Sequence, residues 1–496
     1  MASIRPETEV DRTQAAIARH GGSLPLGQGT VAIDVVREVA ASPVGQRLLV
    51  TLVNELARMK GVVSAIAVTG VSDAPVLPGV PVDGGDLEAG LAGLVASLNT
   101  DASPFRAEIA YDAIDAAVRV SLGGGRADLI VGADGWRALL GGYAGEAAWY
   151  ASAPYGAALA GALTATEVFK LLLLRNGLQD PQRRLAGDLA FSAFNYGVGS
   201  EAALGPDIRE LKLDNLAVVG CGAGGSAALY VLAMQPSVRG DVALIEPGRH
   251  KLSNLNRYLM TTASDVHEGR HKLGSAANHL ARFAPLLRPT LHPVTWEMLD
   301  SRPWPFVLAT VDTVPARWAI QRRAAAGADI LDAAVDDLLY SLVHVMAGGW
   351  CLECKHPYDP DFDLKQRAAR WGQMVDTVRT WTRQNVNVNE EMIARLAEVQ
   401  NRDPANFAGL NGVRFGDVPM LTECGETNLR TDVPSQAAVL PLATTAAGVM
   451  LAAEVAKHFV APDAQLANWL GHDLGRRPDG PRVVWRPASA SCPRHG

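Results

Sequence analysis

The sequence predicts an α/β protein made of two related halves, the second of which carries a helical insertion. Short apolar runs, typical of buried strands, alternate with helical patterns through most of the chain, as in a mostly parallel sheet with helices on both faces. An alanine-rich helical pattern also occurs twice. A chain of 496 residues is longer than one ordinary core requires, so two or three domains are expected.

The composition is that of a globular protein, with 48% hydrophobic and 20% charged residues. A formal net charge of -7 argues against a nucleic-acid partner, because phosphate contacts favour a basic balance. No apolar run is expected to span a membrane and residues 1–20 are too polar for a signal peptide, so we expect a cytoplasmic protein without membrane contact. Five cysteines in so long a chain are no disulfide framework, so each is a candidate for metal binding or catalysis.

In the first half, the pattern predicts a short helix over residues 9–19, then a strand and a helix between residues 30 and 56. Buried strands are expected over 62–68 and 127–131, and a long helix over 157–174. The stretch between the second strand and the third is rich in proline and glycine, which is typical of a loop.

The alanine-rich pattern at 154–172 returns at 440–459. At one fixed spacing, six residues of the first copy meet identical residues of the second: Ala160, Gly161, Ala165, Glu167, Val168 and Lys170 align with Ala447, Gly448, Ala452, Glu454, Val455 and Lys457. Each copy also follows an apolar strand, so we interpret the pair as an internal repeat.

The second half alternates strands with helical stretches, which indicates a mostly parallel sheet. Its strands are expected over 216–219, 242–245, 306–310 and 329–332. A polar segment, 357–423, interrupts this pattern with helix-like runs over 363–382 and 389–400, the second capped by Asn389. The predicted divisions are 1–205 for the first half, 206–356 for the first part of the second half, 357–424 for the insertion and 425–496 for the remainder.

A glycine-rich turn lies between two predicted strands of the second half. In VVGCGAGGS the first strand leads into Gly220, Gly222 and Gly225, with a helix expected from near Ser226, and the next strand ends on Glu246, about 20 residues further on. Glycines let a backbone approach phosphates, a helix N-terminus favours anions, and a carboxylate can bond ribose hydroxyls. This order indicates a nucleotide site, the alternative being a tight turn without a ligand.

Polar and cationic residues beyond this turn narrow the choice of nucleotide. Four of them follow the second strand: Asn254, Asn256, Arg257 and Lys272. They exceed what a dinucleotide's pyrophosphate needs, and they suit a triphosphate whose leaving pyrophosphate must be neutralised. Asp312, at the end of a further strand, is placed to hold Mg²⁺ against those phosphates. Together these residues favour ATP over NAD.

These motifs resemble the ThiF/MoeB/E1 superfamily of ubiquitin-like-protein activating enzymes. The order GCGAGGS, IEP, LSNLNR, Lys272 and Asp312 with Arg317 follows the family's GxGGxGS loop, acidic strand end, SNLxRQ, lysine and Thr/Ser-Asp-Asn-x-x-x-Arg stretch. The resemblance covers roughly 210–350 and 425–496 well and the first half faintly. Three positions depart from the pattern: Glu246 for Asp, Tyr258 for Gln and Thr313 for Asn.

The resemblance implies two Rossmann-like ThiF-type halves, the first degenerate and the second an active adenylation domain. The implied roles are ribose binding by Glu246, phosphate binding by Asn254, Arg257 and Lys272, and Mg²⁺ binding by Asp312. The first half then resembles the inactive partner domain of eukaryotic-type E1 enzymes. Arg12 stands loosely where the family has an arginine that reaches across to the ATP.

Four residues have the spacing of a tetrahedral metal site. Cys351 and Cys354 form a CxxC, while Cys492 and His495 form a CxxH at the end of the chain. Such pairs supply soft donors for a structural Zn²⁺, and the alternative is a reduced CxxC beside a frayed tail. Members of the superfamily often carry zinc knuckles at these two places.

The remaining cysteines differ in their surroundings. Cys221 lies inside the glycine turn, where a small filler is expected. Cys424 lies in the polar stretch LTECGETNLR, which favours exposure, and a thiolate there can exchange an acyl-adenylate for a thioester. The resemblance places the catalytic cysteine of E1 enzymes in this stretch, while the alternative is a buried structural cysteine.

The sequence therefore predicts an E1-like enzyme. It would use ATP to adenylate the C-terminal carboxylate of a ubiquitin-like protein ending in Gly, hold it on Cys424 and pass it to an E2-like protein. The two-half arrangement with an insertion resembles the E1 of bacterial Bil-type ubiquitination-like antiphage operons. Two alternatives stay open: a MoeB/ThiF-type adenylyltransferase for a sulfur-carrier protein, which does not need the 357–423 insertion, and an inactive adenylation-fold scaffold.

Overall fold

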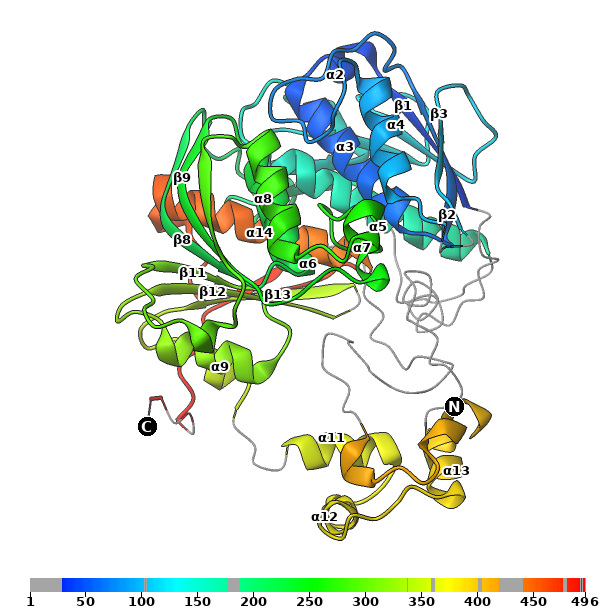
Figure 1. Cartoon of the computed structure of the whole chain (residues 1–496). Coiled ribbons are helices and arrows are strands. Elements are labelled where there is room, and N and C mark those ends of the chain that lie inside the picture. The colour runs from blue at the N-terminus through cyan, green and yellow to red at the C-terminus, as the bar shows by residue number, and fades with distance from the viewer. Residues whose placement is uncertain are drawn as a thin grey trace.

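Two sheets, one from each half, lie on either side of packed helices (Figure 1). The computed structural model describes residues 29–101, 103, 105–176, 187–336, 338–357, 362–399, 404–418, 440–475, 480–490, 492 and 494–495. The helix predicted over 9–19 lies outside these residues.

The first half forms a seven-stranded sheet in the order β3-β2-β1-β4-β5-β6-β7. Its strands are β1 Gly29–Val35, β2 Val63–Thr69, β3 Glu108–Ala110, β4 Val118–Leu122, β5 Leu129–Ala133, β6 Arg137–Leu140 and β7 Leu189–Ser192. Its helices are α2 Arg37–Ala40, α3 Pro43–Arg58, α4 Leu87–Leu98 and α5 Tyr155–Arg175, with 3₁₀ helices η1 Gly141–Glu146 and η2 Gly199–Glu201.

The second half forms an eight-stranded sheet in the order β10-β9-β8-β11-β12-β13-β14-β15. Its strands are β8 Leu211–Val219, β9 Val238–Ile245, β10 Leu287–His292, β11 Phe306–Ala309, β12 Asp329–Asp336, β13 Leu339–Val345, β14 Trp469–Asp473 and β15 Arg482–Val484. Its helices are α6 Ala223–Ala233, α7 Ala263–His267, α8 Lys272–Phe283, α9 Val314–Arg323, α10 Leu352–Lys355 and α14 Pro441–Val460, with η3 Leu252–Asn254, η4 Trp296–Met298 and η7 Pro462–Ala464.

The two sheets repeat one plan. The order of β1 to β7 corresponds strand for strand to that of β8 to β14, and β15 adds an edge. In each sheet the first five strands run parallel and the next two antiparallel. The predicted α/β architecture of two related halves is therefore confirmed, while the residue numbers of the predicted domain boundaries stay predictions.

The repeated helices α5 and α14 pack against each other where the halves meet. Gly161 and Gly448 take matching places in them. A Cβ on Gly161 would lie 2.9 Å from the Thr51 side chain of α3, and one on Gly448 would lie 2.3 Å from that of Ala227 in α6. Each glycine thus lets its helix approach a second helix of the same half closely.

Each repeated helix also buries a lysine that reaches into the other half. Lys170 pairs with the glutamate three residues before it and donates to the carbonyl of Leu474 at 3.1 Å. Lys457 pairs with the glutamate three residues before it and donates to the carbonyl of Phe194 at 3.1 Å. This reciprocal exchange is the pattern of a pseudo-two-fold relation between the halves.

Helix α5 corrects one prediction. Among the described residues it is the one helix long and apolar enough to cross a membrane by length and composition, although no such run was expected. Its most apolar window is 94% buried inside the protein. Because neighbours cover every face of α5, its apolar character is that of a core helix.

The helices expected between 357 and 423 are present (Figure 1). They have a hydrophobic core of their own. They are α11 Phe362–Trp371, α12 Val375–Arg383 and α13 Glu390–Val399, followed by η5 Pro404–Leu410 and η6 Phe415–Asp417. The single run predicted over 363–382 is wrong, because Gly372 adopts φ 57° and ends α11. Asn389 caps α13 as predicted, since its Oδ1 accepts from the Met392 amide at 2.9 Å.

Two further differences concern the sheet domain. Helix α6 begins at Ala223 rather than near Ser226. Strand β10 was not predicted, because its sequence LRPTLH contains a proline and is largely exposed at the sheet edge. Both differences bear on the site, since α6 and the segment after β10 contribute to it.

Candidate functional site

A cavity of about 520 Å³ lies at the carboxyl ends of β8, β9 and β11. Most of its lining comes from five segments and one helix start: 219–224, 245–248, 257–258, 294–297, 310–317 and Lys272. Ala333, Val335 and Thr444 complete it. The strand order reverses between β8 and β11. Ligands of open α/β sheets bind at such a reversal, outside the carboxyl ends of the strands.

The glycine turn forms one wall of this cavity. Gly220 has φ 96°, and a Cβ there would lie 2.6 Å from the carbonyl oxygen of Thr310. Gly225 lies in the first turn of α6, where a Cβ would lie 2.0 Å from the carbonyl oxygen of Gly220. Only glycine permits these approaches, so the N-terminus of α6 opens directly on the cavity beside Gly222.

Glu246 lies at the end of β9 with both oxygens engaged. Its Oε2 accepts from the Cys221 amide at 3.0 Å, and its Oε1 accepts from the Gly248 amide at 2.7 Å. Lys272 Nζ lies 3.5 Å from the same Oε1. The carboxylate therefore ties the glycine turn to β9 and holds Lys272 at the cavity wall.

Arg257 and Lys272 contact the ring of Tyr258. Arg257 Cζ lies 5.1 Å and Lys272 Nζ 5.5 Å from the ring centroid, and all three residues line the cavity. Arg257 also donates to the Ser253 carbonyl at 2.7 Å and to Asn256 Oδ1 at 3.0 Å. The tyrosine that replaces the family's glutamine thus holds two cations at the cavity through cation–π contacts.

Asn254 and Asn256 are fully buried, and neither belongs to the cavity lining. Asn254 Oδ1 accepts from the Lys251 amide at 2.9 Å, which closes η3, while Asn256 holds the guanidinium of Arg257. In this structure the two asparagines shape the loop that carries Arg257. A direct phosphate contact from either one stays a prediction.

Asp312 is exposed at the cavity, with a buried ion network behind it. Arg317 donates to the carbonyl of Val311 at 2.6 Å and is paired with Asp332, which also lies 3.1 Å from Lys355 Nζ. Burial alone would raise the pKa of the Asp332 carboxyl, but Arg317 and Lys355 bring it below its ordinary value. The network fixes the strand end that presents Asp312.

Sequence reasoning missed Trp296, which lines the cavity and is 2% exposed. Its ring lies 5.4 Å from Arg302 Cζ, and its indole nitrogen has no hydrogen-bond partner in the described part of the chain. Because β10 was not predicted, no signal placed the segment after it at the cavity. The ring belongs to the hydrophobic core on this side of the sheet and lies 5.9 Å from the ring of Trp304, so it supports this wall of the cavity.

The cavity favours anions. Helices α6, α8 and α9 each begin at or beside residues that line it, so the positive ends of three helix dipoles lie near the cavity. Arg257 and Lys272 add two positive charges, while Glu246 and Asp312 offer carboxylates to a ribose and a divalent cation. The arrangement suits a nucleoside triphosphate whose leaving pyrophosphate is neutralised as it departs.

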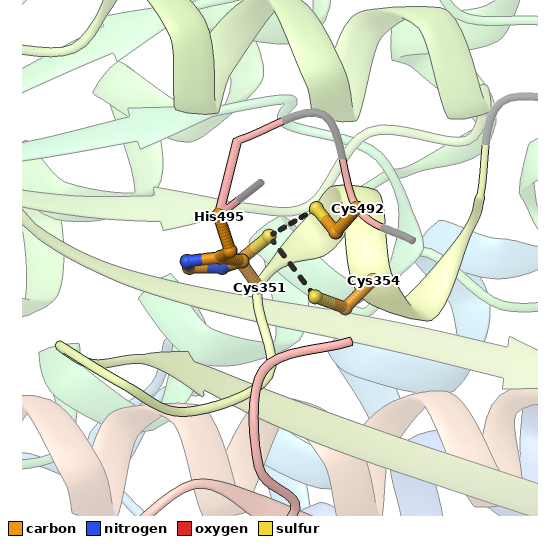
Figure 2. Close-up of side chains that lie close together, drawn as sticks. All are labelled: Cys351, Cys354, Cys492 and His495. Atoms are coloured by element: carbon orange, nitrogen blue, oxygen red, sulfur yellow. Dashed lines mark hydrogen bonds between the residues drawn. The ribbon is translucent and has the colours of Figure 1, made fainter. Parts of the chain in front are cut away.

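Cys351, Cys354, Cys492 and His495 come together from two distant segments (Figure 2). Their ligand atoms all lie within 4.8 Å of one another. Cys351 Sγ lies 3.6 Å from Cys354 Sγ and 3.7 Å from Cys492 Sγ. Tetrahedral Zn²⁺ with Zn–S bonds of about 2.3 Å requires sulfur atoms about 3.8 Å apart, so the spacing of these sulfurs fits zinc.

The C-terminal segment is also held beside this cluster by protein contacts. The amide of Trp350 donates to the carbonyl of Arg486 at 2.8 Å, and the amide of Ser489 donates to Cys354 Sγ at 3.3 Å. The guanidinium of Arg486 lies 4.5 Å from the ring of Trp350 and 4.4 Å from that of Trp469. A frayed tail does not fit these contacts.

The matching place in the first half is closed. Strand β1 leads into Val36 and α2 instead of a glycine turn. A Cβ on Gly123, just after β4, would lie 2.5 Å from the Val39 side chain and 3.3 Å from that of Val36. Apolar side chains therefore fill the place where Gly220 meets Thr310 in the second half, in agreement with a degenerate first half.

Two predicted residues, Cys424 and Arg12, lie outside the described residues, so the structure does not place them. Cys221 is 2% exposed. Burial, and after it the nearby Glu246, raise the pKa of the Cys221 thiol well above its ordinary value. This cysteine is therefore an inert filler, as predicted.

Residues 200–477 match the ThiF family, and residues 30–184 match the BilD N-terminal domain. Because the first match covers more than half of the sequence, the chain belongs to the ThiF family. The resemblance to the ThiF/MoeB/E1 superfamily is thereby confirmed, and the BilD match confirms the resemblance to proteins of Bil-type operons.

Two curated relatives match parts of the chain. The chain is 26% identical over 340 residues to uncharacterized protein y4jF of Sinorhizobium fredii, covering 66% of this chain and 64% of that protein. It is 30% identical over 125 residues to a sulfur carrier protein adenylyltransferase of Thermus thermophilus, covering 24% of this chain and 45% of that protein. The chain thus spans less than two thirds of the length of either relative.

Solved structures of E. coli MccB are also similar. The complex with MccA-N7isoASN matches with a TM-score of 0.36 and 12% identity, over 56% of this chain and 66% of that chain. The complex with ATP matches with a TM-score of 0.36 and 12% identity, over 74% of this chain and 98% of that chain.

Proposed function

We propose that this protein is an E1-like activating enzyme that adenylates the C-terminal carboxylate of a ubiquitin-like protein. A carboxylate oxygen attacks the α-phosphorus of ATP, the bond to the β-phosphate breaks, and pyrophosphate leaves with the bonding electrons. The observation that carries the proposal is the convergence of Arg257, Lys272, Glu246 and Asp312 on one cavity beside the glycine turn. Membership of the ThiF family supports an adenylating role.

The proposed roles follow from charge and position. Glu246 orients the ribose, because its carboxylate is fixed by two amides at the end of β9. Arg257 and Lys272 neutralise the phosphates and the leaving pyrophosphate. Asp312 would hold Mg²⁺, which when bound supplies further positive charge to the phosphates. The segment 294–297 of the lining would then receive the adenine.

A structural Zn²⁺ would be held by Cys351, Cys354, Cys492 and His495, and would join the C-terminal segment to the sheet domain. The acyl group would pass to the thiolate of Cys424, which attacks the acyl carbon and releases AMP. An E2-like protein would then accept the thioester. The Cys424 step rests on the sequence resemblance, and we propose that all these reactions take place in the cytoplasm.

Pyrophosphate exchange into ATP tests the adenylation step. The wild-type chain, given ATP, labelled pyrophosphate and a small Gly-ending protein, is expected to exchange label, and Lys272→Ala is expected to lose the exchange. Lys212→Ala is the matched control, because Lys212 is exposed and pairs with Asp214 away from the cavity. Wild-type chain without exchange for any such partner would favour the inactive scaffold.

A second candidate is a sulfur-carrier adenylyltransferase, favoured by the match to the Thermus thermophilus enzyme. Non-reducing electrophoresis separates the two. A conjugate that reducing agent removes and that Cys424→Ala does not form supports the E1-like enzyme. If the wild-type chain and Cys424→Ala both stop at the adenylate, the sulfur-carrier role is supported instead.

A further inference from the structure

Arg58, the last residue of α3 in the first half, reaches into the second half. Its side chain is 1% exposed. Nη1 donates to the Leu255 carbonyl at 2.8 Å, and Nη2 donates to the carbonyls of Leu259 and Thr261 at 2.7 and 3.0 Å. The three acceptors belong to the loop that carries Arg257.

The guanidinium is fixed on its other side by the same helix. Asn54 Oδ1 accepts from Arg58 Nε at 2.8 Å, and Asn54 Nδ2 donates to the carbonyl of Leu259 at 3.2 Å. A buried cation is costly unless its donors are satisfied, and here four bonds engage all three nitrogens of the guanidinium. Burial lowers the pKa of Arg58 to about 9, so the group still carries its charge at neutral pH.

The accepted carbonyls bracket the cavity-lining pair Arg257 and Tyr258. One acceptor, Leu255, precedes the pair and the other two follow it. The backbone on both sides of the pair is therefore held by a single rigid group from the other half. A small shift of this backbone would displace the guanidinium that faces the cavity.

The two halves are not alike at this contact. Helices α3 and α6 are equivalent, because Gly161 packs on Thr51 of α3 and its counterpart Gly448 packs on Ala227 of α6. Arg58 follows Thr51 by the same number of residues as Met234 follows Ala227, so Met234 is the counterpart of Arg58. The reciprocal contact exists, since a Cβ on Gly79 of the first half would lie 2.9 Å from the carbonyl of Met234. The helix position that has a cation, Arg58, in the first half thus has the uncharged Met234 in the second half.

We propose that Arg58 is a positioning residue for nucleotide binding, through which the first half holds the Arg257 loop of the second half in its binding conformation. The inference rests on the proposed function, because it takes ATP as the ligand of the cavity. It gives the degenerate half a defined role: the closed half orders the open one.

The test compares Arg58→Met with Arg47→Met in the full-length chain. Arg47 lies on the same helix and is 1% exposed, but its guanidinium donates to the Ser152 carbonyl within the first half at 2.8 Å. Both variants are expected to lose stability, which thermal melting measures. Only Arg58→Met is expected to weaken the binding of ATP with Mg²⁺, by about tenfold in calorimetric titration.

Hydrogen–deuterium exchange gives a readout that does not depend on ATP. Peptides covering 251–262 are expected to exchange faster in Arg58→Met than in wild type or Arg47→Met. Arg58→Lys keeps a charge and some donors, so both effects should be intermediate. Asn54→Ala removes the Asn54 bond to the Leu259 carbonyl and the acceptor of Arg58 Nε, so it should act in the same direction if Arg58→Met does not fold.

Several outcomes would overturn the inference. A folded Arg58→Met that binds ATP within twofold of wild type, or an Arg47→Met with an equal loss, shows that Arg58 has only a structural role. Unchanged exchange of 251–262 in Arg58→Met or Asn54→Ala rules out the loop contact directly. If the wild-type chain itself binds no ATP, the proposed function fails, and the exchange comparison still decides whether Arg58 holds the loop.

Discussion

Asp332 is the residue at which a single change should affect both stability and nucleotide binding. Its carboxylate is fully buried between Arg317 and Lys355. Asp332→Asn keeps the shape but removes the negative charge that faces Arg317 and Lys355. Removal of one partner of a buried pair destabilises by about 3–5 kcal/mol, and the retained amide oxygen places this variant at about 3 kcal/mol.

The assay is calorimetric melting at pH 7.5. A loss of about 3 kcal/mol corresponds to a fall in melting temperature of roughly 6–12 °C for a domain of about 150–250 residues. Asp241→Asn is the matched control, because its pair with Arg288 lies 3.0 Å apart with both side chains more than half exposed. Such pairs contribute little, so a shift of no more than about 2 °C is expected there.

The ATP affinity of Asp332→Asn should fall as well. Arg317 donates to the Val311 carbonyl beside Asp312, and without its counter-charge it no longer fixes that strand end. The pKa of Asp332 is lowered in the folded chain, so its contribution is present above about pH 3.8 and is lost as the pH falls through the lowered value. A variant that melts within 2 °C of wild type would refute this reasoning.

Four further outcomes are expected. Metal analysis should find one zinc per chain. A chelator, or the substitution Cys354→Ser, should remove the zinc and lower the melting temperature. An unchanged zinc content in Cys354→Ser would exclude this cluster as the zinc site. Burial lowers the pKa of His472 to about 3 and of His250 to about 4. The stability that these neutral histidines contribute is therefore full above about pH 6.5, and it falls by about 1.4 kcal/mol per pH unit for each histidine as the pH drops towards its lowered pKa. Urea unfolding at pH 7.5 and 5.5 measures this loss, and equal midpoints would contradict it. Gly448→Ala should lower the free energy of unfolding by about 1–3 kcal/mol, because its methyl group overpacks against α6. Gly93→Ala should raise it by up to about 1 kcal/mol, because a Cβ there would meet no atom within 4 Å. Urea midpoints that move in the same direction in both variants would refute this contrast. Titration calorimetry should find one ATP per chain, because apolar side chains close the matching place in the first half, and two would show that this place is open.

The sequence predicted those features that local chemistry dictates. The glycine turn, the acidic strand end and the CxxC pair each follow from what a backbone or a metal requires over a few residues. The repeat was also visible, because a buried helix must keep its small residues and its Glu-x-x-Lys pair in register. These features did not depend on knowing which elements meet in space.

What the sequence missed depends on pairing between distant segments. Strand β10 has a proline and polar side chains, since an edge strand is half exposed, and its absence from the prediction hid Trp296. Arg58 has no local signal at all, because its acceptors are carbonyls about two hundred positions away in the other half. The burial of Asn254 and Asn256 was likewise not visible in the sequence, because it depends on how their loop packs.

The asymmetry of the halves has a physical basis in one pair of strand ends. In the second half a glycine follows β8, so Gly220 lies close against Thr310, and the first residues of α6 line the cavity. In the first half the glycine belongs to the opposite strand end, so Gly123 makes room for Val36 and Val39 instead. The same sheet geometry thus gives a cavity in one half and an apolar core in the other. In the proposal above, the closed first half supplies α3, and through it Arg58, to hold the loop that carries Arg257.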